Sequence, residues 1–303
     1  MMNRAGSSTA RVETMSAELL VDAHTTLGEG PVWDDAERCL WWVDILEGIV
    51  HRTDPATGDD ERHPVGQFVG AIGLRRSGGL VAAVRDGFAT FDPITDRLEL
   101  IADLQDDGRT LRMNDGKVDP GGRFWAGMMA IDHRDGAGTL YRLDPDGTVE
   151  PMVRGTSISN GLDWSPDAMT MYYIDSTPRT VDRFAYDAAT GDISDRTTLI
   201  PIRDGAGFPD GMTVDAEGFL WVALWDGWGA ERYAPDGRLD RRVEVPAQQA
   251  SSCAFGGPDL DLLFITTAQE GFPPGGKPDQ PQAGGLFVCQ PGVRGRPPFR
   301  FGG

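Results

Sequence analysis

Three oxygen-bearing side chains stand out because each lies beside a glycine and just before an apolar segment. They are Glu29, Asn160 and Asp210. Two carboxylates and one amide oxygen make a hard ligand set, which suits calcium, magnesium or manganese. Each motif alone is weak evidence, because Asn-Gly and Asp-Gly are common turn dipeptides. The three side chains make a site only if the fold brings them together.

The elements that would position these side chains form a repeat. A turn containing Asp, Pro or Gly is followed by an apolar strand and then by a second strand, and this pattern occurs six times. From Trp42 in the first copy to Phe264 in the last, equivalent positions lie about 39 to 48 residues apart, which is typical of four-stranded propeller blades. We therefore predict an all-β fold, a six-bladed β-propeller with four-stranded blades around a central metal-containing channel.

The chain is predicted to form one domain, because no Pro/Ser-rich linker divides it. Residues 17–295 are assigned to the propeller, 1–16 to a flexible N-terminal segment and 296–303 to a C-terminal tail that is expected to be poorly ordered. Residues 17–23 are expected to form a strand that pairs with the last blade and closes the ring. Four large side chains at equivalent positions are expected to pack between blades: Trp42, Trp125, Trp221 and Phe264.

A propeller brings equivalent positions of different blades together near its axis. The loop before the strand nearest the axis opens on one face of the channel, and Glu29, Asn160 and Asp210 are expected at that point of three blades. We therefore expect them to share one divalent metal ion. Calcium is favoured, with magnesium, manganese, zinc or iron as alternatives. Zinc is less natural, because four scattered histidines and three distant cysteines offer no zinc motif.

Composition limits the partners that we expect. The net charge of −19 repels phosphate backbones and anionic lipid, so we expect neither nucleic acid nor a membrane as a partner. The first 20 residues show no apolar signal-peptide core, and the odd number of cysteines indicates reduced thiols. We expect a cytoplasmic protein that is a monomer or a small homo-oligomer.

Several phrases of the chain resemble the SMP-30/gluconolactonase family. They begin at Leu27, Arg112, Asn160, Pro209 and Cys253, and the resemblance runs from about Leu27 to Gly271. It implies a six-bladed propeller that holds one divalent metal.

The resemblance also implies roles for individual residues. Glu29, Asn160 and Asp210 would be the metal ligands, and Asp210 would also accept and donate the proton in catalysis. Arg112 and Asn114 would bind substrate hydroxyls, with Asn114 close to the metal. A family glutamate that contacts the substrate aligns with Asp132, whose side chain is shorter.

The expected function is hydrolysis of a sugar (aldono) lactone to the corresponding aldonic acid. The metal would polarise the lactone carbonyl, and Asp210 would take a proton from the attacking water. One alternative is a propeller phosphotriesterase or arylesterase, since the same metal would polarise a P=O bond. Another is a non-catalytic calcium-binding propeller. The Arg112–Asn114 pair favours a polyhydroxylated small molecule as the partner.

Overall fold

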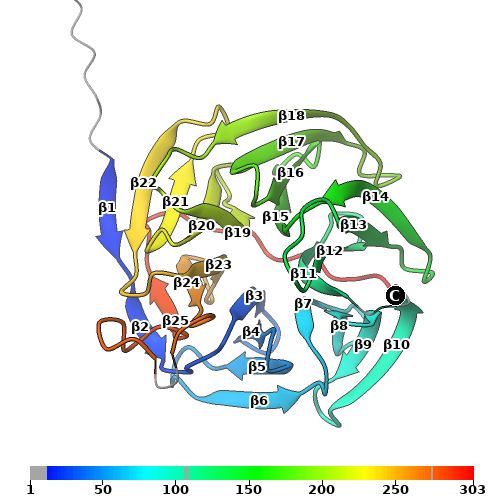
Figure 1. Cartoon of the computed structure of the whole chain (residues 1–303), viewed down its shortest axis with the longest axis horizontal. Coiled ribbons are helices and arrows are strands. Elements are labelled where there is room, and N and C mark those ends of the chain that lie inside the picture. The colour runs from blue at the N-terminus through cyan, green and yellow to red at the C-terminus, as the bar shows by residue number, and fades with distance from the viewer. Residues whose placement is uncertain (1–11, 106–107, 109, 274–275) are drawn as a thin grey trace, which may run out of the picture.

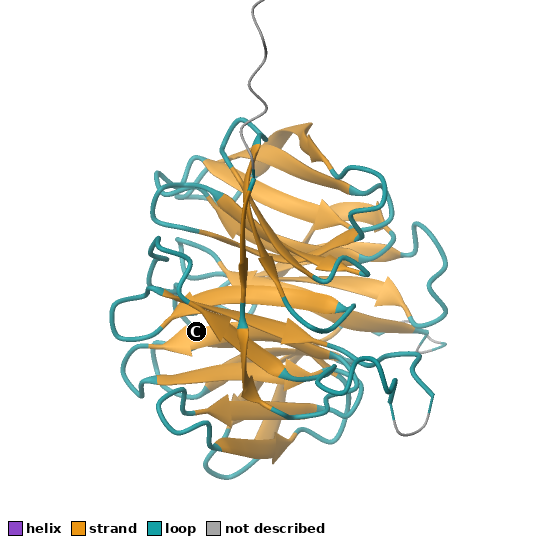
Figure 2. Ribbon diagram, turned by 90° about the vertical axis from the view of Figure 1, so that its left-hand side faces the viewer, coloured by secondary structure: helices purple, strands orange, loops and turns teal. Residues whose placement is uncertain are grey.

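The computed structural model describes residues 12–105, 108, 110–273 and 276–303. Six antiparallel sheets surround a central axis, like the blades of a propeller (Figure 1). Seen from the side, the strands run between two faces that carry the connecting loops (Figure 2). This confirms the predicted all-β, six-bladed architecture. In the described part of the chain, no helix is long and apolar enough to cross a membrane.

Each blade is a four-stranded meander whose first strand lies nearest the axis. Blades 1 to 3 contain β3 (Gly28–Asp34), β4 (Cys39–Asp44), β5 (Ile49–Thr53) and β6 (Asp60–Pro64); β7 (Val69–Leu74), β8 (Leu80–Val84), β9 (Gly87–Asp92) and β10 (Arg97–Asp103); and β11 (Leu111–Val118), β12 (Phe124–Ala130), β13 (Gly138–Leu143) and β14 (Val149–Thr156). Blades 4 and 5 contain β15 (Ser159–Trp164), β16 (Thr170–Asp175), β17 (Thr180–Tyr186) and β18 (Ile193–Pro201); and β19 (Phe208–Val214), β20 (Leu220–Trp225), β21 (Gly229–Tyr233) and β22 (Leu239–Glu244).

Blade 6 combines the two ends of the chain. Its inner strands are β23 (Ala250–Gly256), β24 (Leu262–Thr267) and β25 (Leu286–Cys289), and its outermost strand is β2 (Glu18–Val21). The pairing of β2 with β25 is antiparallel and opposes Leu19 to Phe287. The predicted closure of the ring by a strand within residues 17–23 is therefore confirmed.

The two chain ends are more ordered than the sequence suggested. Within the expected flexible segment 1–16, residues Glu13–Ser16 form β1, which pairs in parallel with β22 as a fifth strand of blade 5. At the other end, Phe301 is buried and pairs with Arg75 of blade 2. The expectation of a poorly ordered terminus is wrong for residues 296–303, because backbone hydrogen bonds and apolar burial hold them against the blades.

Aromatic rings fill the spaces between neighbouring blades. Trp42, Trp125, Trp221 and Phe264 are fully buried, as predicted. Phe264 of blade 6 stacks on Trp33 of blade 1 with ring centroids 6.3 Å apart, and Trp125 of blade 3 meets Trp164 of blade 4 at 6.1 Å. Among the described strands, no ladder joins one blade to the next, and a single isolated bridge pairs Leu27 with Ala268 between blades 1 and 6. The packing of these rings therefore contributes much of the contact between blades.

Removal of β2 should open the ring. A chain that begins at Asp22 lacks both β1 and β2, and it should unfold roughly 5–10 °C lower than the full chain, because β25 loses its partner. A chain that begins at Glu18 lacks only β1 and is the matched control. Thermal unfolding followed by circular dichroism measures both. Equal midpoints for the two shortened chains would contradict closure by β2.

Candidate functional site

The predicted ligand side chains lie in β-bulges of the innermost strands. The pairing register shifts between Glu29 and Val32 in β3, Met113 and Gly116 in β11, Ser159 and Leu162 in β15, and Pro209 and Met212 in β19. Each shift leaves one extra residue on the innermost strand, which bends the strand and redirects the neighbouring side chains. The innermost strands β7 and β23 carry a shift of the same kind, so the bulge recurs in all six blades and is a feature of the whole ring.

This placement corrects one expectation. The sequence suggested that these residues occupy loops before the strand nearest the axis. They lie inside that strand, and the apolar strand of each repeat is the second strand of its blade. The glycines have a packing role instead of a turn role. A Cβ on Gly161 would lie 2.6 Å from the backbone oxygen of Asp210, and one on Gly211 would overlap the hydroxyl of Ser252.

A hydrogen-bond network joins the site residues of blades 3, 4 and 5. Asn114 Nδ2 donates to Asn160 Oδ1 at 2.8 Å and to the backbone oxygen of Ser159 at 2.9 Å. Asn160 Nδ2 donates to the hydroxyl of Ser176 at 2.8 Å, and that hydroxyl donates to the backbone oxygen of Pro209 at 2.6 Å. These bonds fix the orientation of both asparagines. Asn160 Oδ1 keeps a second lone pair for a further partner.

Arg112 lies beside this network. Its Nη1 donates to Asn114 Oδ1 at 2.6 Å and to the backbone oxygen of Met113 at 3.1 Å. A guanidinium carries five N–H donors, and within the described residues no hydrogen bond uses the donors on Nε and Nη2. Arg112 therefore has donors available for a ligand in the cavity.

One cavity of about 290 Å³ collects these side chains at the N-terminal ends of the innermost strands. Glu29, Arg112, Asn114, Asn160 and Asp210 are each at most 6% exposed. The cavity is also lined by Leu27, Met129, His133, Ile158, Ser176, Thr177, Phe208, Trp225, Asp226 and Glu270. The structure thus brings together five of the six site residues that the sequence suggested.

Asp132 is the exception. It lies in the turn after β12, where its carboxylate is exposed and pairs with Arg134 at 3.0 Å. It does not line the cavity, whereas the adjacent His133 does. His133 adopts a positive φ of 58°. The backbone turn therefore separates the two neighbours, and the role suggested for Asp132 by alignment lacks geometric support.

Buried negative charge dominates the electrostatics of the cavity. Burial, reinforced by the nearby charge of Asp115, raises the pKa of Glu29 to about 8. Burial also raises the pKa of Asp210 well above its ordinary value, with Glu29, Asp115 and Glu270 adding to the effect. Arg112 is the cation that opposes these shifts. The cavity therefore concentrates carboxylates that lack enough positive charge to ionise together.

A divalent cation fits this arrangement. Glu29, Asn160 and Asp210 supply three oxygen donors from three blades, and no hydrogen bond to the Asp210 carboxylate occurs within the described residues. No cluster of three His, Cys, Asp or Glu side chains suited to a metal exists in that part of the chain, and the amide oxygen of Asn160 supplies a ligand of another type. A bound dication would supply the missing positive charge.

Sequence reasoning missed several residues of the cavity. Glu270 follows β24, Trp225 is the last residue of β20, and Asp226 follows β20. Their shared signal is position, because the turn after the second strand of a blade opens on the same face as the start of the first strand. No local motif marks them, so only the fold reveals Glu270 as a further carboxylate of the cavity.

Comparison with known proteins identifies the family of the chain. The model of the SMP-30/gluconolactonase/LRE-like region matches residues 27–269. The chain belongs to this family. Regucalcin of Xenopus laevis is 39% identical over 299 residues, which cover 96% of this chain and 100% of that protein. The "Putative sugar lactone lactonase YvrE" of Bacillus subtilis is 38% identical, with 95% and 99% covered.

A solved structure supports the same relation. The crystal structure of a calcium-binding protein, regucalcin, from Agrobacterium tumefaciens is 33% identical and superposes with a TM-score of 0.90. The match covers 96% of this chain and 100% of that one. The resemblance suggested by the sequence is thereby confirmed at the level of the family.

Metal affinity should rise with pH. The pKa of Glu29 is raised in the metal-free fold. At pH values below its ordinary pKa of 4.5 this group therefore contributes to the stability of the fold, and that contribution is lost as the pH rises towards about 8. A cation needs the ionised form, so binding must displace protons in this window. Calorimetric titration with Ca²⁺ near pH 6, in buffers of different ionisation enthalpy, should detect release of about one proton or more per ion. Affinity that is independent of pH, without proton release, would contradict this account.

Proposed function

We propose that the protein is a divalent-metal-dependent lactonase that hydrolyses an aldonolactone to its aldonic acid. The observation that carries the proposal is the convergence of Glu29, Asn160 and Asp210 with the Arg112–Asn114 pair in one cavity. Membership of the SMP-30/gluconolactonase family supports it. The name of the Bacillus subtilis relative points to the same substrate class, and the Agrobacterium relative points to calcium as the ion.

Glu29, Asn160 and Asp210 would hold the cation. When bound, the cation supplies a Lewis acid that polarises the lactone carbonyl. Asp210 has two carboxylate oxygens, so one can serve as a ligand while the other faces the cavity. The second oxygen can accept a proton from the attacking water and later return it to the departing ring oxygen. Burial excludes competing solvent from this transfer, since Asp210 is only 6% exposed.

Arg112 and Asn114 would orient the sugar. The unused guanidinium donors of Arg112 can bind hydroxyl oxygens, and the bond from Arg112 to Asn114 fixes both side chains relative to Asn160. Apolar side chains form another part of the wall, among them Met129, Ile158 and Trp225. This combination of a few fixed polar groups with an apolar wall is typical of small-molecule sites. Correct alignment lowers the barrier, because the lactone is held where the water attacks.

Asp210→Asn should abolish most of the activity. The substitution removes the proton acceptor and weakens a ligand, so kcat with gluconolactone should fall by about 10²-fold or more. The control is Glu99→Gln, an exposed residue of β10 on the outer side of blade 2. A pH-stat assay over a panel of aldonolactones measures the rates, with and without chelation of the metal. Undiminished turnover in Asp210→Asn or after chelation would refute the mechanism, and faster hydrolysis of paraoxon than of any lactone would favour the phosphotriesterase alternative.

The charge of the cavity should select uncharged lactones. Glu29, Asp210, Asp226 and Glu270 oppose Arg112, so the cavity stays net negative even with one dication bound. A lactone that carries a phosphate should have a lower kcat/KM than the same lactone without it. The selectivity ratio is kcat/KM for the lactone without phosphate divided by kcat/KM for the phosphorylated lactone. Glu270→Gln should lower this ratio by about threefold to tenfold at low ionic strength, because one repelling charge is removed. Glu99→Gln, which removes a distant charge, should leave the ratio unchanged.

That selectivity is measured by comparing kcat/KM for gluconolactone and its 6-phosphate. Equal values for the two substrates in the unmodified protein would show that the carboxylates do not govern selectivity. An unchanged ratio in Glu270→Gln would remove Glu270 from the substrate cavity.

A further inference from the structure

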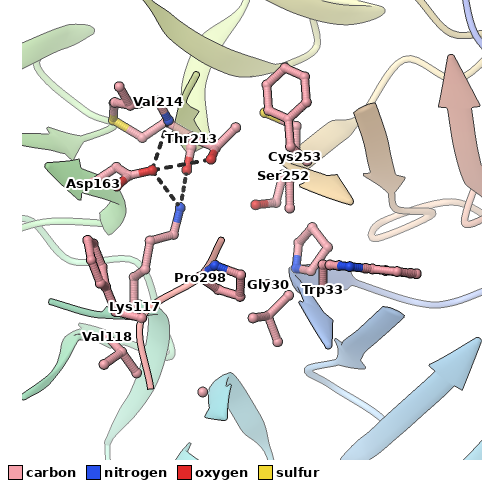
Figure 3. Close-up of a pocket in the computed structure, with 18 of the residues that line it drawn as sticks. Gly30, Trp33, Lys117, Val118, Asp163, Thr213, Val214, Ser252, Cys253 and Pro298 are labelled. Atoms are coloured by element: carbon pink, nitrogen blue, oxygen red, sulfur yellow. Dashed lines mark hydrogen bonds and ion pairs between the residues drawn. The ribbon is translucent and has the colours of Figure 1, made fainter. Parts of the chain in front are cut away.

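A second layer of polar contacts lies beneath the site. Three residues beyond Asn114, Asn160 and Asp210 on the same strands are Lys117, Asp163 and Thr213. Three residues of strand span about 10 Å, so this layer lies deeper in the channel. It borders a separate cavity of about 70 Å³ at the C-terminal ends of the innermost strands (Figure 3), which we call the lower cavity.

Asp163 is the centre of the deeper layer. Its Oδ2 accepts hydrogen bonds from the backbone N–H of Val214 at 2.8 Å and the hydroxyl of Thr213 at 3.2 Å, and it lies 3.4 Å from Lys117 Nζ. Lys117 Nζ also donates to the backbone oxygen of Met212 at 2.7 Å. Figure 3 shows these contacts converging on the Asp163 carboxylate. They join β11, β15 and β19, the strands that carry Asn114, Asn160 and Asp210.

The C-terminal segment completes this layer. Arg296 Nη2 donates to Asp163 Oδ1 at 3.1 Å and to the backbone oxygen of Trp164 at 2.7 Å. Arg296 Nε donates to the backbone oxygen of Val214 at 3.4 Å. Burial raises the pKa of Asp163, but the charges of Lys117 and Arg296 outweigh it and bring the pKa below the ordinary value. Asp163 is therefore a buried anion held between two cations.

The same segment contacts every blade. We call residues 294–303 the C-terminal strap; it crosses the centre of the ring after β25 (Figure 1). Besides the Arg296–Asp163 contact with blade 4, its contacts are Arg300 with Asp34 of blade 1, Phe301 with Leu74 of blade 2, Gly302 with Gly122 of blade 3, Arg294 with Ala216 of blade 5 and Gly295 with Leu260 of blade 6. Pro297, Pro298 and Phe299 line the lower cavity. The strap thus spans the end of the channel opposite the site.

We propose that the C-terminal strap is a positioning element of the metal site, acting through Arg296 and Asp163 on the strands that carry Asn114, Asn160 and Asp210. The inference rests on the metal site of the proposed function. Among the described strands, no ladder joins β11, β15 and β19 to one another, so side-chain bridges help the packing between blades to set the spacing of these three strands. The Asn114–Asn160 bond is the bridge at the level of the site, and the contacts of Asp163 are the bridge beneath it. Removal of Arg296 weakens the lower bridge without touching a ligand.

The test compares Arg296→Ala with Arg300→Ala. Both arginines belong to the strap, both bind aspartates, and their side chains are 19% and 29% exposed. Arg296 joins two ligand strands, because it contacts Asp163 of β15 and Val214 of β19. Arg300 binds Asp34 and Asp35 of blade 1 and joins no ligand strand to another. Calorimetric titration with Ca²⁺ should show affinity lowered by about tenfold in Arg296→Ala. This is the lower end of the range of losses in metal affinity that follow removal of an outer-shell partner. Arg300→Ala should bind as the unmodified chain does, although both variants lose stability in the metal-free state.

Two further measurements separate positioning from general destabilisation. Arg296→Lys, which keeps the charge but not the fork of donors, should recover part of the affinity. Lactonase activity of Arg296→Ala should return towards the unmodified kcat when Ca²⁺ is raised tenfold, because the chemistry itself is intact. Unchanged Ca²⁺ affinity in Arg296→Ala, or an equal loss in Arg300→Ala, would overturn the proposal.

The outcomes also distinguish the two proposals. If the unmodified chain binds Ca²⁺ but hydrolyses no lactone, the proposed function fails, and the affinity ratio still decides the role of the strap. If lactone is hydrolysed with metal and Arg296→Ala binds Ca²⁺ normally, only the positioning role fails. Absence of Ca²⁺ binding by the unmodified chain would overturn both.

Discussion

Negative charge buried without compensation governs the centre of this propeller. Glu29 and Asp210 are almost fully enclosed, and Asp115 and Glu270 add to the potential around them, while Arg112 is the main opposing cation. Such an arrangement is costly in a metal-free protein, because buried carboxylates must either hold protons or repel one another. A divalent cation would remove the conflict. The proposed metal binding, the expected proton release and the expected preference for an uncharged ligand therefore all follow from one charge balance.

The polar side chains of the channel form two layers with different roles. The upper layer leaves oxygen atoms facing a cavity, so it can hold an ion and a substrate. The lower layer holds Asp163 between Lys117 and Arg296, so these three charged groups are bound to one another and can stiffen the ring. Both layers lie on the same innermost strands, three residues apart. A rigid base beneath a site with unpaired charge is a general way to keep ligands in place before the ion arrives.

Much of this fold could be predicted from the sequence, because a structural repeat leaves a repeated pattern of residues along the chain. Six copies of the turn-strand pattern specified the blade count, and the aromatic positions such as Trp125 and Phe264 specified the packing between blades. The positions of Glu29, Asn160 and Asp210 in the repeat predicted their convergence. The sequence did not indicate that these residues lie in bulges, because a bulge and a turn favour the same Asn-Gly and Asp-Gly pairs.

Other features could not be predicted because they depend on contacts between distant segments. Glu270 enters the cavity only through the shape of the loop after β24, and no motif marks it. The backbone turn at Asp132 and His133 places His133 in the lining of the cavity and leaves Asp132 outside it, which the sequence did not indicate. The C-terminal strap has a Pro- and Gly-rich composition that suggested disorder. Its backbone groups nevertheless find partners on blades 2, 3, 5 and 6, and the side chains of Arg300 and Arg296 bind blades 1 and 4.

Closure by both chain ends has a consequence for synthesis. The strand β2 precedes β3 to β24 in the chain, but its partner β25 ends at Cys289. Blades 1 to 5 can form their meanders from local pairings, whereas blade 6 needs contact between segments far apart in the chain. The ring can therefore close only after β25 has been synthesised. A ribosome that stalls before Cys289 holds a propeller with an open seam.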